Sequence, residues 1–266
     1  MKRMSGYFKV GVVLTAVLLA LILLGQIWTP YDPQTMSPSE KLQSPSADHW
    51  MGTDNFGRDI FSRVIRGAGT TLGIALATVI ISCTAGTVIG ALTGYFGGRV
   101  DTILMRFNDA LTAFPSILLG LVFVSVLGGG TQNVILALSS VFTPSFARVT
   151  RSAYASVRDA NYIKSARLMG AGKVRILTVH ILPNILQVLL PAVTIGFNNA
   201  VLAEASMSYL GIGSMGSLGY ILSDAQSMLY SAPWYALCAG GTIVLLIFGV
   251  GLMGEGLQRG EGGRYA

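Results

Sequence analysis

Six long apolar runs constrain this chain more than any other feature of its sequence. They cover residues 10–28, 70–94, 111–127, 133–149, 185–203 and 234–253. A helix of about 20 mostly apolar residues crosses the hydrocarbon core of a bilayer. The fourth run is the weakest, because Ser139, Ser140, Thr143 and Pro144 interrupt it. The pattern predicts an all-α membrane protein with about six transmembrane helices.

The composition excludes an ordinary soluble domain. Hydrophobic residues make up 52% of the chain and charged residues only 11%, whereas soluble domains carry roughly 25% charged residues. The two cysteines, Cys83 and Cys238, both fall in apolar runs and are interpreted as small buried hydrophobes. His49 and His180 are too far apart in the sequence to predict a metal site.

Lysine and arginine are distributed unevenly among the segments between the apolar runs. With the N-terminus in the cytoplasm, six spans return the C-terminus to the same side, and most of the 18 Lys and Arg residues become cytoplasmic. The terminal ones are Lys2, Arg3, Lys9, Arg259 and Arg264, and the outside keeps Lys41, Arg58, Arg63 and Arg66. The positive-inside rule predicts this asymmetry. It also explains the net charge of +6 without a nucleic-acid partner.

The first apolar run is predicted to be a retained helix rather than a secretion signal. It is longer than a signal core of roughly 7–15 residues, and residues 26–30 offer no small-residue cleavage site. The predicted layout is therefore a tail and first helix over 1–28 and an extracytoplasmic segment over 29–69. A five-helix transmembrane core follows over 70–257, with a cytoplasmic loop at 150–184 and a cytoplasmic tail over 258–266.

Small residues recur at helical spacing in the second run. Gly86, Gly90 and Gly94 follow a small-xxx-small pattern, which lets another helix approach closely. The pattern fits packing within the chain or a seam between two chains.

One carboxylate lies deep in the apolar part of the sequence. Glu204 falls toward the outer end of the fifth run, where a charge is costly and usually faces a cavity or a partner. One interpretation is that it accepts hydrogen bonds from the nearby outer segment. The other places it on a solute route together with Asn198 and Asn199.

Nucleotide-binding and catalytic motifs are not supported. The G-x-G-x-x-G matches at 211–216 and 249–254 lie at ends of apolar runs and not in a βαβ unit, which that fingerprint requires. The sequence around Gly170-Ala171-Gly172-Lys173 has Arg167 where a phosphate loop needs its first glycine, and Val174 follows the lysine. No H-E-x-x-H motif or Ser-His-Asp set stands out. The chain is predicted not to be an enzyme and to bind no cofactor.

The cytoplasmic stretch 161–184, NYIKSARLMGAGKVRILTVHILPN, has helical character followed by a glycine break. Four residues recur at helical spacing: Tyr162, Ala166, Met169 and Lys173. Gly170 and Gly172 then interrupt the helix among basic side chains. A short amphipathic helix of this kind suits a groove on a soluble partner, and the alternative is a basic loop that obeys the positive-inside rule.

This stretch resembles the EAA loop of permease subunits in ABC-type importers, through Ala166, Gly170 and Leu182-Pro183. The resemblance implies a coupling helix that docks on an ATPase subunit. The residues it assigns to coupling are Tyr162, Lys164, Ser165, Ala166, Arg167, Met169, Gly170, Ala171 and Gly172. Lys164 and Ser165 stand where the family has Glu and Ala, so a specific salt bridge through that glutamate is not expected.

Further segments resemble the smaller, C-type subunit of the dipeptide, oligopeptide and nickel permeases. They are 31–33 (YDP), 51–63 (MGTDNFGRDIFSR), 94–101 (GYFGGRVD), 113–115 (AFP) and 204–211 (EASMSYLG). The resemblance implies the type I importer permease fold in the cell's inner or plasma membrane. Peptide permeases usually carry a Pro-rich stretch at the position of residues 214–218, and this chain does not. Its lack of that stretch is more typical of the nickel or metal-chelate branch.

The resemblance also implies a set of partners. These are a second permease in a heterodimer, two ATPases that hold ATP and Mg, an extracytoplasmic solute-binding protein and membrane lipid. The expected solute is nickel as a metal chelate or a short peptide, with a purely peptide importer as the alternative. A secondary transporter or a membrane enzyme would need polar sets within the spans that the sequence does not show.

Four outer residues are candidates for partner contact: Asp54, Arg58, Asp59 and Arg63. Their charges equally permit salt bridges within the chain. Both interpretations stay open at this point.

Overall fold

The structure is a computed structural model that describes residues 6–261, with side chains through residue 256. Within this range it is helical, apart from an isolated bridge between Thr53 and Asp59. The helices are α1 (Gly6–Ile27), η1 (Pro38–Glu40), α2 (Ile60–Phe96), α3 (Gly98–Thr112), α4 (Ser116–Leu127), α5 (Thr131–Val157), α6 (Asn161–Leu168), α7 (Lys173–Arg175), the π-helical turn η2 (Ile176–Ile181), α8 (Leu182–Tyr209), α9 (Leu218–Gln226) and α10 (Pro233–Glu261). Lys2, Arg3, Arg264 and the last part of the predicted tail lie outside the described residues, as does the side chain of Arg259.

Four helical segments are long and apolar enough to cross a membrane. They are Gly6–Ile27, Ile60–Phe96, Lys173–Tyr209 and Pro233–Gly256. The bent pair α3 and α4 makes a fifth if it is one span. Helix α5 is 27 residues long, but its polar residues keep it out of this set. The predicted all-α membrane architecture is confirmed, and the sidedness of the termini stays a prediction.

The third predicted span, 111–127, is wrong in its shape. The chain bends by 90° between α3 and α4, and only the 12 residues of α4 continue as helix. Pro115 explains the break, because proline disfavours helical conformation in the preceding residue and lacks an N–H donor. Hydropathy shows a continuous apolar run and does not report this corner.

Helix α2 begins at Ile60, before the predicted start of its apolar run at residue 70. Asp59 caps it by accepting a hydrogen bond from the backbone N–H of Ser62. At 37 residues the helix is about 55 Å long, well beyond the roughly 30 Å hydrocarbon core of a bilayer. Its first turns therefore lie outside the apolar layer, where polar residues are tolerated.

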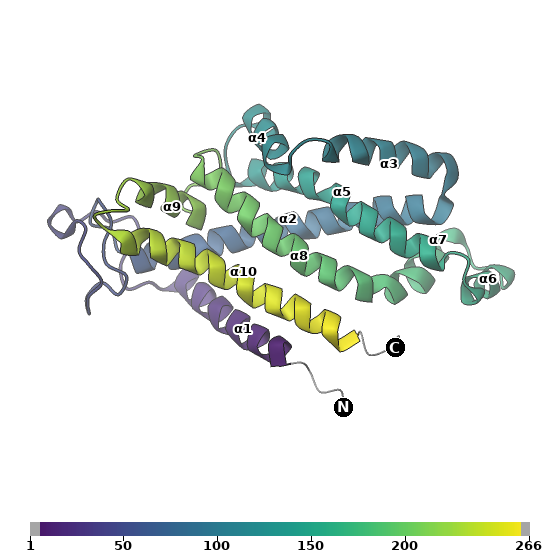
Figure 1. Cartoon of the computed structure of the whole chain (residues 1–266), viewed down its shortest axis with the longest axis horizontal. Helices are drawn as coiled ribbons and strands as arrows, with labels where there is room; N and C mark the ends of the chain where they lie inside the picture. The colour runs from purple at the N-terminus through teal and green to yellow at the C-terminus, as the bar shows by residue number, and fades with distance from the viewer. Residues whose placement is uncertain (1–5, 262–266) are drawn as a thin grey trace.

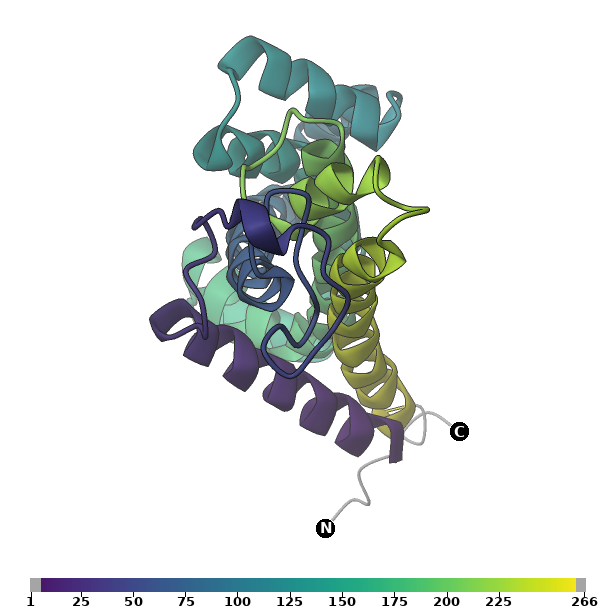
Figure 2. The same ribbon diagram turned by 90° about the vertical axis from the view of Figure 1, so that its left-hand side faces the viewer.

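The helices form one elongated bundle (Figure 1). Helix α2 packs along α5, α8 contacts α2, α5 and α10, and α1 lies against α10 at one side, as Figure 2 also shows. The loop 28–59 closes one end of the bundle, whereas α6 and α7 project from the other. The start of α1 and the end of α10 point toward the α6 end.

The glycines of α2 serve packing within the chain. A Cβ at Gly86 would lie 2.5 Å from Phe146 Cβ, one at Gly90 would lie 2.5 Å from Thr150 Cβ, and one at Gly94 would lie 2.5 Å from the Arg151 carbonyl oxygen. All three neighbours belong to α5. The small-xxx-small face thus seats α5 rather than forming a seam between chains.

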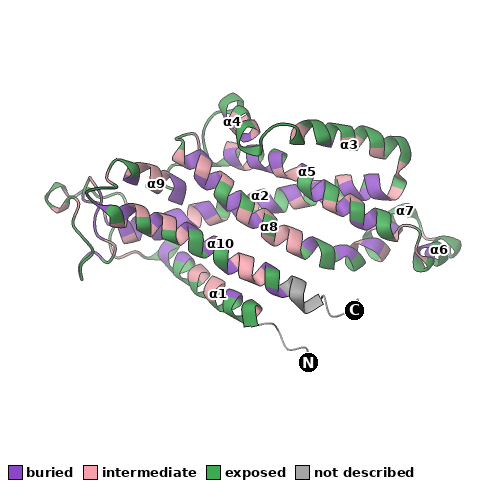
Figure 3. Ribbon diagram, viewed as in Figure 1, coloured by how far each residue is buried: buried purple, intermediate pink, exposed green. Residues whose placement is uncertain are grey.

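Exposed residues lie along most helices of the bundle (Figure 3), and large apolar side chains are among them. Val13, Ile80 and Val244, on three different spans, are each more than 60% exposed. Soluble monomers rarely expose apolar surface on this scale. Lipid is the solvent that suits this exterior.

Candidate functional site

The turn after α6 is built around one glycine. Gly170 has a φ of 82°, which favours glycine because other residues are strained there. The N–H of Ala171 bonds to the carbonyl of Ala166, and the N–H of Gly170 bonds to that of Arg167, each at 3.0 Å. This is the Schellman pattern that ends helices. Gly172, with a φ of −68°, has no such requirement.

One face of α6 is buried and the rest is exposed. Ile163 and Ala166 are at most 2% exposed, and Ile163 packs in a cluster with residues of α2, α5, η2 and α8. Of the residues assigned to coupling, Ala166 therefore faces inward and Ala171 is half-buried, whereas the others are exposed. The exposed side carries large apolar groups: Leu168 at 90%, Met169 at 80% and Val174 at 74%.

Cations tie this turn to the end of α2. The Arg167 guanidinium lies 5.3 Å from the Tyr95 ring centre, and the Lys173 ammonium lies 5.5 Å from that of Phe96. Arg167 also donates a hydrogen bond to the carbonyl of Arg158 at 3.2 Å. These contacts connect the turn to the end of α2 and to the residue that caps α5.

At the opposite end of the bundle, Asp54 is fully buried in the loop 28–59. Its Oδ1 accepts hydrogen bonds from the backbone N–H groups of Phe56 at 2.7 Å and Arg58 at 3.0 Å. Its Oδ2 accepts from Arg58 Nε at 2.6 Å and from Arg63. This carboxylate organises the loop on the first turn of α2.

Arg63 joins this loop to the C-terminal part of the chain. Its Nη2 donates to Asp224 of α9 at 2.8 Å, and its Nη1 donates to the Tyr235 hydroxyl of α10. Arg63 is 6% exposed. Buried charges are found where they are paired, and here the pairing connects three elements.

Asp59 has a structural role of its own. Its Oδ2 accepts from the Ser62 backbone N–H at 2.8 Å and from the Ser62 hydroxyl at 2.6 Å, and its Oδ1 lies 2.9 Å from His49 Nδ1. The His49 ring packs against Tyr31, with centroids 4.6 Å apart. The four outer candidates thus form internal ion pairs and hydrogen bonds, and their contact with a partner protein stays a prediction.

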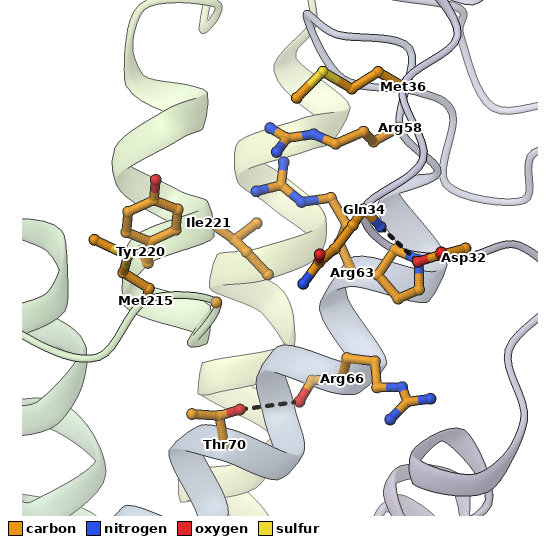
Figure 4. A pocket seen from close by; sticks show the side chains of 12 residues that line it. Asp32, Gln34, Met36, Arg58, Arg63, Arg66, Thr70, Met215, Tyr220 and Ile221 are labelled. Carbon is orange, nitrogen blue, oxygen red and sulfur yellow. Dashed lines mark hydrogen bonds between the residues drawn. The ribbon is translucent and has the colours of Figure 1, made fainter. Parts of the chain in front are cut away.

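A cavity of about 630 Å³ lies beside this network (Figure 4). Residues 32–36 of the loop, the first turns of α2 and residues 215–221 line it. Arg58 and Arg63 extend their guanidinium groups toward the side that carries Tyr220, whereas Arg66 points away from them. The wall facing solvent thus combines charged and aromatic groups.

Glu204 is fully buried in α8. Its Oε1 accepts a hydrogen bond from the Ser208 hydroxyl at 2.6 Å, and that hydroxyl accepts one from the Ser214 backbone N–H at 3.0 Å. Its Oε2 is buried without a hydrogen-bond partner among the described residues. The bonded partner belongs to the same helix, not to the segment 29–69.

Asn198 and Asn199 have different neighbours from those of Glu204. Asn199 lines a cavity of about 290 Å³ between α3, α4, α5 and α8, with Thr112, Ser116 and Ser145. Asn198 is half-buried and approaches Gly251 of α10, where a Cβ would lie 3.3 Å from its Nδ2. The structure does not bring the three predicted route residues to one cavity.

An exposed ion pair adjoins the cavity of Asn199. Arg148 Nη2 donates to Asp109 Oδ1 at 3.0 Å and to the Thr112 hydroxyl at 3.3 Å. Both charged side chains are more than half exposed. Polar side chains of α3, α5 and α8 thus form a small polar face around this cavity, among apolar neighbours.

Comparison with known proteins assigns this chain to a family. The family described as "Binding-protein-dependent transport system inner membrane component" matches residues 86–260. The chain belongs to this family. It is an inner-membrane transport subunit rather than an enzyme, as the sequence predicts.

Relatives of this permease are named after several different solutes. It is 36% identical over 252 residues to the dipeptide transport system permease protein DppC of Alkalihalophilus pseudofirmus, covering 94% of this chain and 83% of that one. It is 34% identical over 253 residues to the nickel transport system permease protein NikC of Escherichia coli K12, covering 94% and 91%. With the glutathione transport system permease protein GsiD of Pectobacterium atrosepticum it shares 35% identity over 246 residues, covering 91% and 82%.

The fold of the permease matches a solved importer. The MetNI methionine ABC transporter in inward-facing conformations superposes with a TM-score of 0.62 at 22% identity, over 74% of this chain and 95% of that one. The predicted type I importer permease fold is confirmed. Membership in the family implies ATPase and binding-protein partners, and it removes the alternatives of a secondary transporter and a membrane enzyme.

Sequence reasoning missed several residues of this permease that the structure brings forward. Leu168 and Val174 flank the turn at Gly170, and their signal was an apolar side chain away from the buried face of α6. Asp224 and Tyr235 complete the outer network, but they lie more than 150 positions from Arg63. No spacing in the sequence could pair residues so far apart.

Proposed function

We propose that this permease pairs with a second, related permease, receives a small solute from a binding protein, and is driven by two ATPase subunits that bind ATP and Mg. The turn of α6 carries the proposal. It presents Leu168, Met169 and Val174 to solvent at one end of the bundle, where lipid does not explain their exposure. Exposed apolar groups rimmed by polar residues mark protein contact sites.

The attachment of this turn suits it to coupling. Ile163 anchors α6 in a core shared with α5 and α8, and Arg167 and Lys173 contact the aromatic end of α2. A groove that closes on the exposed side of α6 would move these helices together. The nine coupling residues stay as assigned, with Leu168 and Val174 added as docking groups.

The solute route is proposed to follow the polar face of α3, α5 and α8. Asp109 and Arg148 are exposed there beside the cavity that Asn199, Thr112 and Ser145 line. Charges in membrane segments face cavities, water or partners rather than lipid. The second permease would cover this face and complete the route, so Asn199 belongs to the proposed pathway, whereas Glu204 braces the outer end of α8.

The solute is proposed to be a short peptide or a metal held in a small chelator. The three relatives carry dipeptide, nickel and glutathione in their names. In the described part of the chain, no three His, Cys, Asp or Glu side chains are grouped so that they could hold a metal ion. A bare ion needs several ligands together, which favours a metal that arrives already chelated.

Docking of the ATPase is tested with Met169→Glu. A charge in the centre of a docking patch is expected to reduce co-purification of the ATPase by about tenfold or more. The matched control is Tyr230→Glu, at a fully exposed residue in the loop before α10, which should retain the ATPase. Normal recovery of the ATPase with Met169→Glu would assign the contact to another surface.

The route is tested by thiol labelling in a background with Cys83 and Cys238 replaced by alanine. Ser145→Cys should react with a charged, water-soluble maleimide in the assembled complex, and Val244→Cys on the lipid-facing surface should not. Equal protection of both thiols would show that the polar face of α3, α5 and α8 is sealed from water.

A further inference from the structure

The cavity beside the outer ion-pair network has the size and lining of a small-molecule site. Its volume of about 630 Å³ falls within the roughly 300–1,000 Å³ typical of ligand pockets. Three separate parts of the chain build it, and Figure 4 shows guanidinium, amide and phenol groups around it. The ion-pair network uses the wall of this cavity but leaves its interior open.

Arg58 presents unused hydrogen-bond donors in this wall. Its Nε bonds to Asp54 at 2.6 Å and its guanidinium lies 4.8 Å from the centre of the Phe56 ring. Neither terminal nitrogen makes a hydrogen bond among the described residues, since the nearest carboxylate oxygen, of Asp224, is 3.6 Å from Nη2. The side chain is only 15% exposed. It is thus held in place with four terminal N–H groups that make no hydrogen bond to the described residues, although Nη2 forms a 3.6 Å ion pair with Asp224.

A planar guanidinium with free terminal donors matches one ligand group best. Two parallel N–H groups bind the two oxygens of a carboxylate, with charge assistance. Arg63 lies in the same wall, but its donors already serve Asp54, Asp224 and Tyr235. Arg66 also lines the cavity but points away from Arg58, so Arg58 is the cation that directs terminal donors without a hydrogen bond toward the side of Tyr220.

The rest of the lining limits the ligand to a small, weakly charged molecule. Asp32 lies in the same cavity, and only its Oδ1 is engaged, by the Gln34 backbone N–H at 2.9 Å. The charges of Arg58 and Arg63 are balanced by Asp54 and Asp224. A polyanion would gain little here, whereas a zwitterion could place a carboxylate at Arg58 and an ammonium near Asp32.

We propose that this cavity is a subsite for the carboxylate of the transported solute, bound by the terminal nitrogens of Arg58. The proposal rests on the proposed transport function and narrows the solute to small molecules with a free carboxylate, short peptides included. Arg58 acts here as a binding residue that Asp54 and Phe56 hold in position.

The test uses the full chain with its co-purifying partners in lipid nanodiscs. Binding of alanyl-alanine and of its C-terminal carboxamide is measured by saturation-transfer NMR. The free dipeptide is expected to bind about tenfold more tightly than its amide, because the amide loses a charge-assisted pair of hydrogen bonds. Equal binding of the two compounds to the unaltered protein would overturn the proposal.

Variants assign the preference to Arg58. Arg58→Lys keeps a cation beside Asp54 but removes the fork, so the preference for the dipeptide should fall to about twofold or less. The control Lys41→Gln, at an exposed residue of the same loop that does not line the cavity, should keep the full preference. A purely structural effect of Arg58→Lys would weaken both compounds alike, and that result would also overturn the proposal.

Two further readouts distinguish a solute subsite from a surface that docks the binding protein. If Arg58→Lys weakens capture of the binding protein and leaves the dipeptide preference intact, Arg58 serves protein docking and the subsite is rejected. ATP-dependent uptake by the same complex in vesicles tests transport separately, because the nanodisc measurement needs neither ATP nor solute translocation.

Discussion

At the end of the bundle that carries the loop 28–59, charged side chains are buried and paired, whereas at the end that carries α6, apolar side chains are exposed. Asp54 and Arg63 are at most 6% exposed, and Leu168 is 90% exposed. Both ends reverse the usual preference of their residue types. The buried charges hold helices together, whereas no other described part of the chain packs over the exposed apolar groups.

The difference shows how a partner-contact surface can be told from an internal brace. At the outer end Asp54 and Asp59 have basic or backbone partners within the chain, so their charges are already used. At the α6 end the backbone is satisfied by the turn, but the apolar side chains are not covered. Unsatisfied groups, not conspicuous ones, indicate where another molecule binds.

Gly170→Pro should have the largest effect on this comparison. Proline cannot adopt the φ of 82° at this position and removes the N–H that bonds to Arg167. Uptake by the complex should be abolished while the chain remains in the membrane. Gly172→Ala is the control, since its φ is ordinary and a Cβ meets no atom within 4 Å. Normal uptake with Gly170→Pro would mean that the turn does not present the coupling helix.

Asp54→Ala should have the next largest effect, on stability rather than docking. It leaves Arg58 and Arg63 without their shared carboxylate in a buried site, and removing one partner of a buried pair costs about 3–5 kcal/mol. Chemical unfolding in detergent, followed by tryptophan fluorescence, measures the loss. Lys41→Ala, a change of an exposed charge in the same loop, should be within about 0.5 kcal/mol of the unaltered chain. Similar losses for both would show that the outer charges act as solvated surface.

Arg167→Gln should have the smallest effect. It removes the contact with the Tyr95 ring and the bond to the Arg158 carbonyl, and an exposed cation–π contact is worth about 0.5–1 kcal/mol. Amide hydrogen exchange across 161–172 should become faster, with global stability almost unchanged. Lys164→Gln, at an exposed position on the same helix, is the control. Unchanged exchange would show that the buried face of α6 alone holds the turn.

Parts of this molecule follow directly from its sequence. The apolar runs predict the membrane helices because each residue's transfer to lipid depends on its own side chain and only on its near neighbours. The turn at Gly170 is also local, since its backbone conformation and both capping hydrogen bonds lie within six residues. These features need no knowledge of distant contacts.

Other parts were decided by the tertiary structure. Arg63 meets Asp224 and Tyr235 only because α2, α9 and α10 converge at one end of the bundle, and this convergence gives Arg63 partners within the chain. Asn199 joins Thr112 and Ser145 at a cavity, whereas Glu204 bonds within α8. The physical reason is the same in each case. Pairing of polar groups depends on distances between helices, and packing of the whole chain sets those distances.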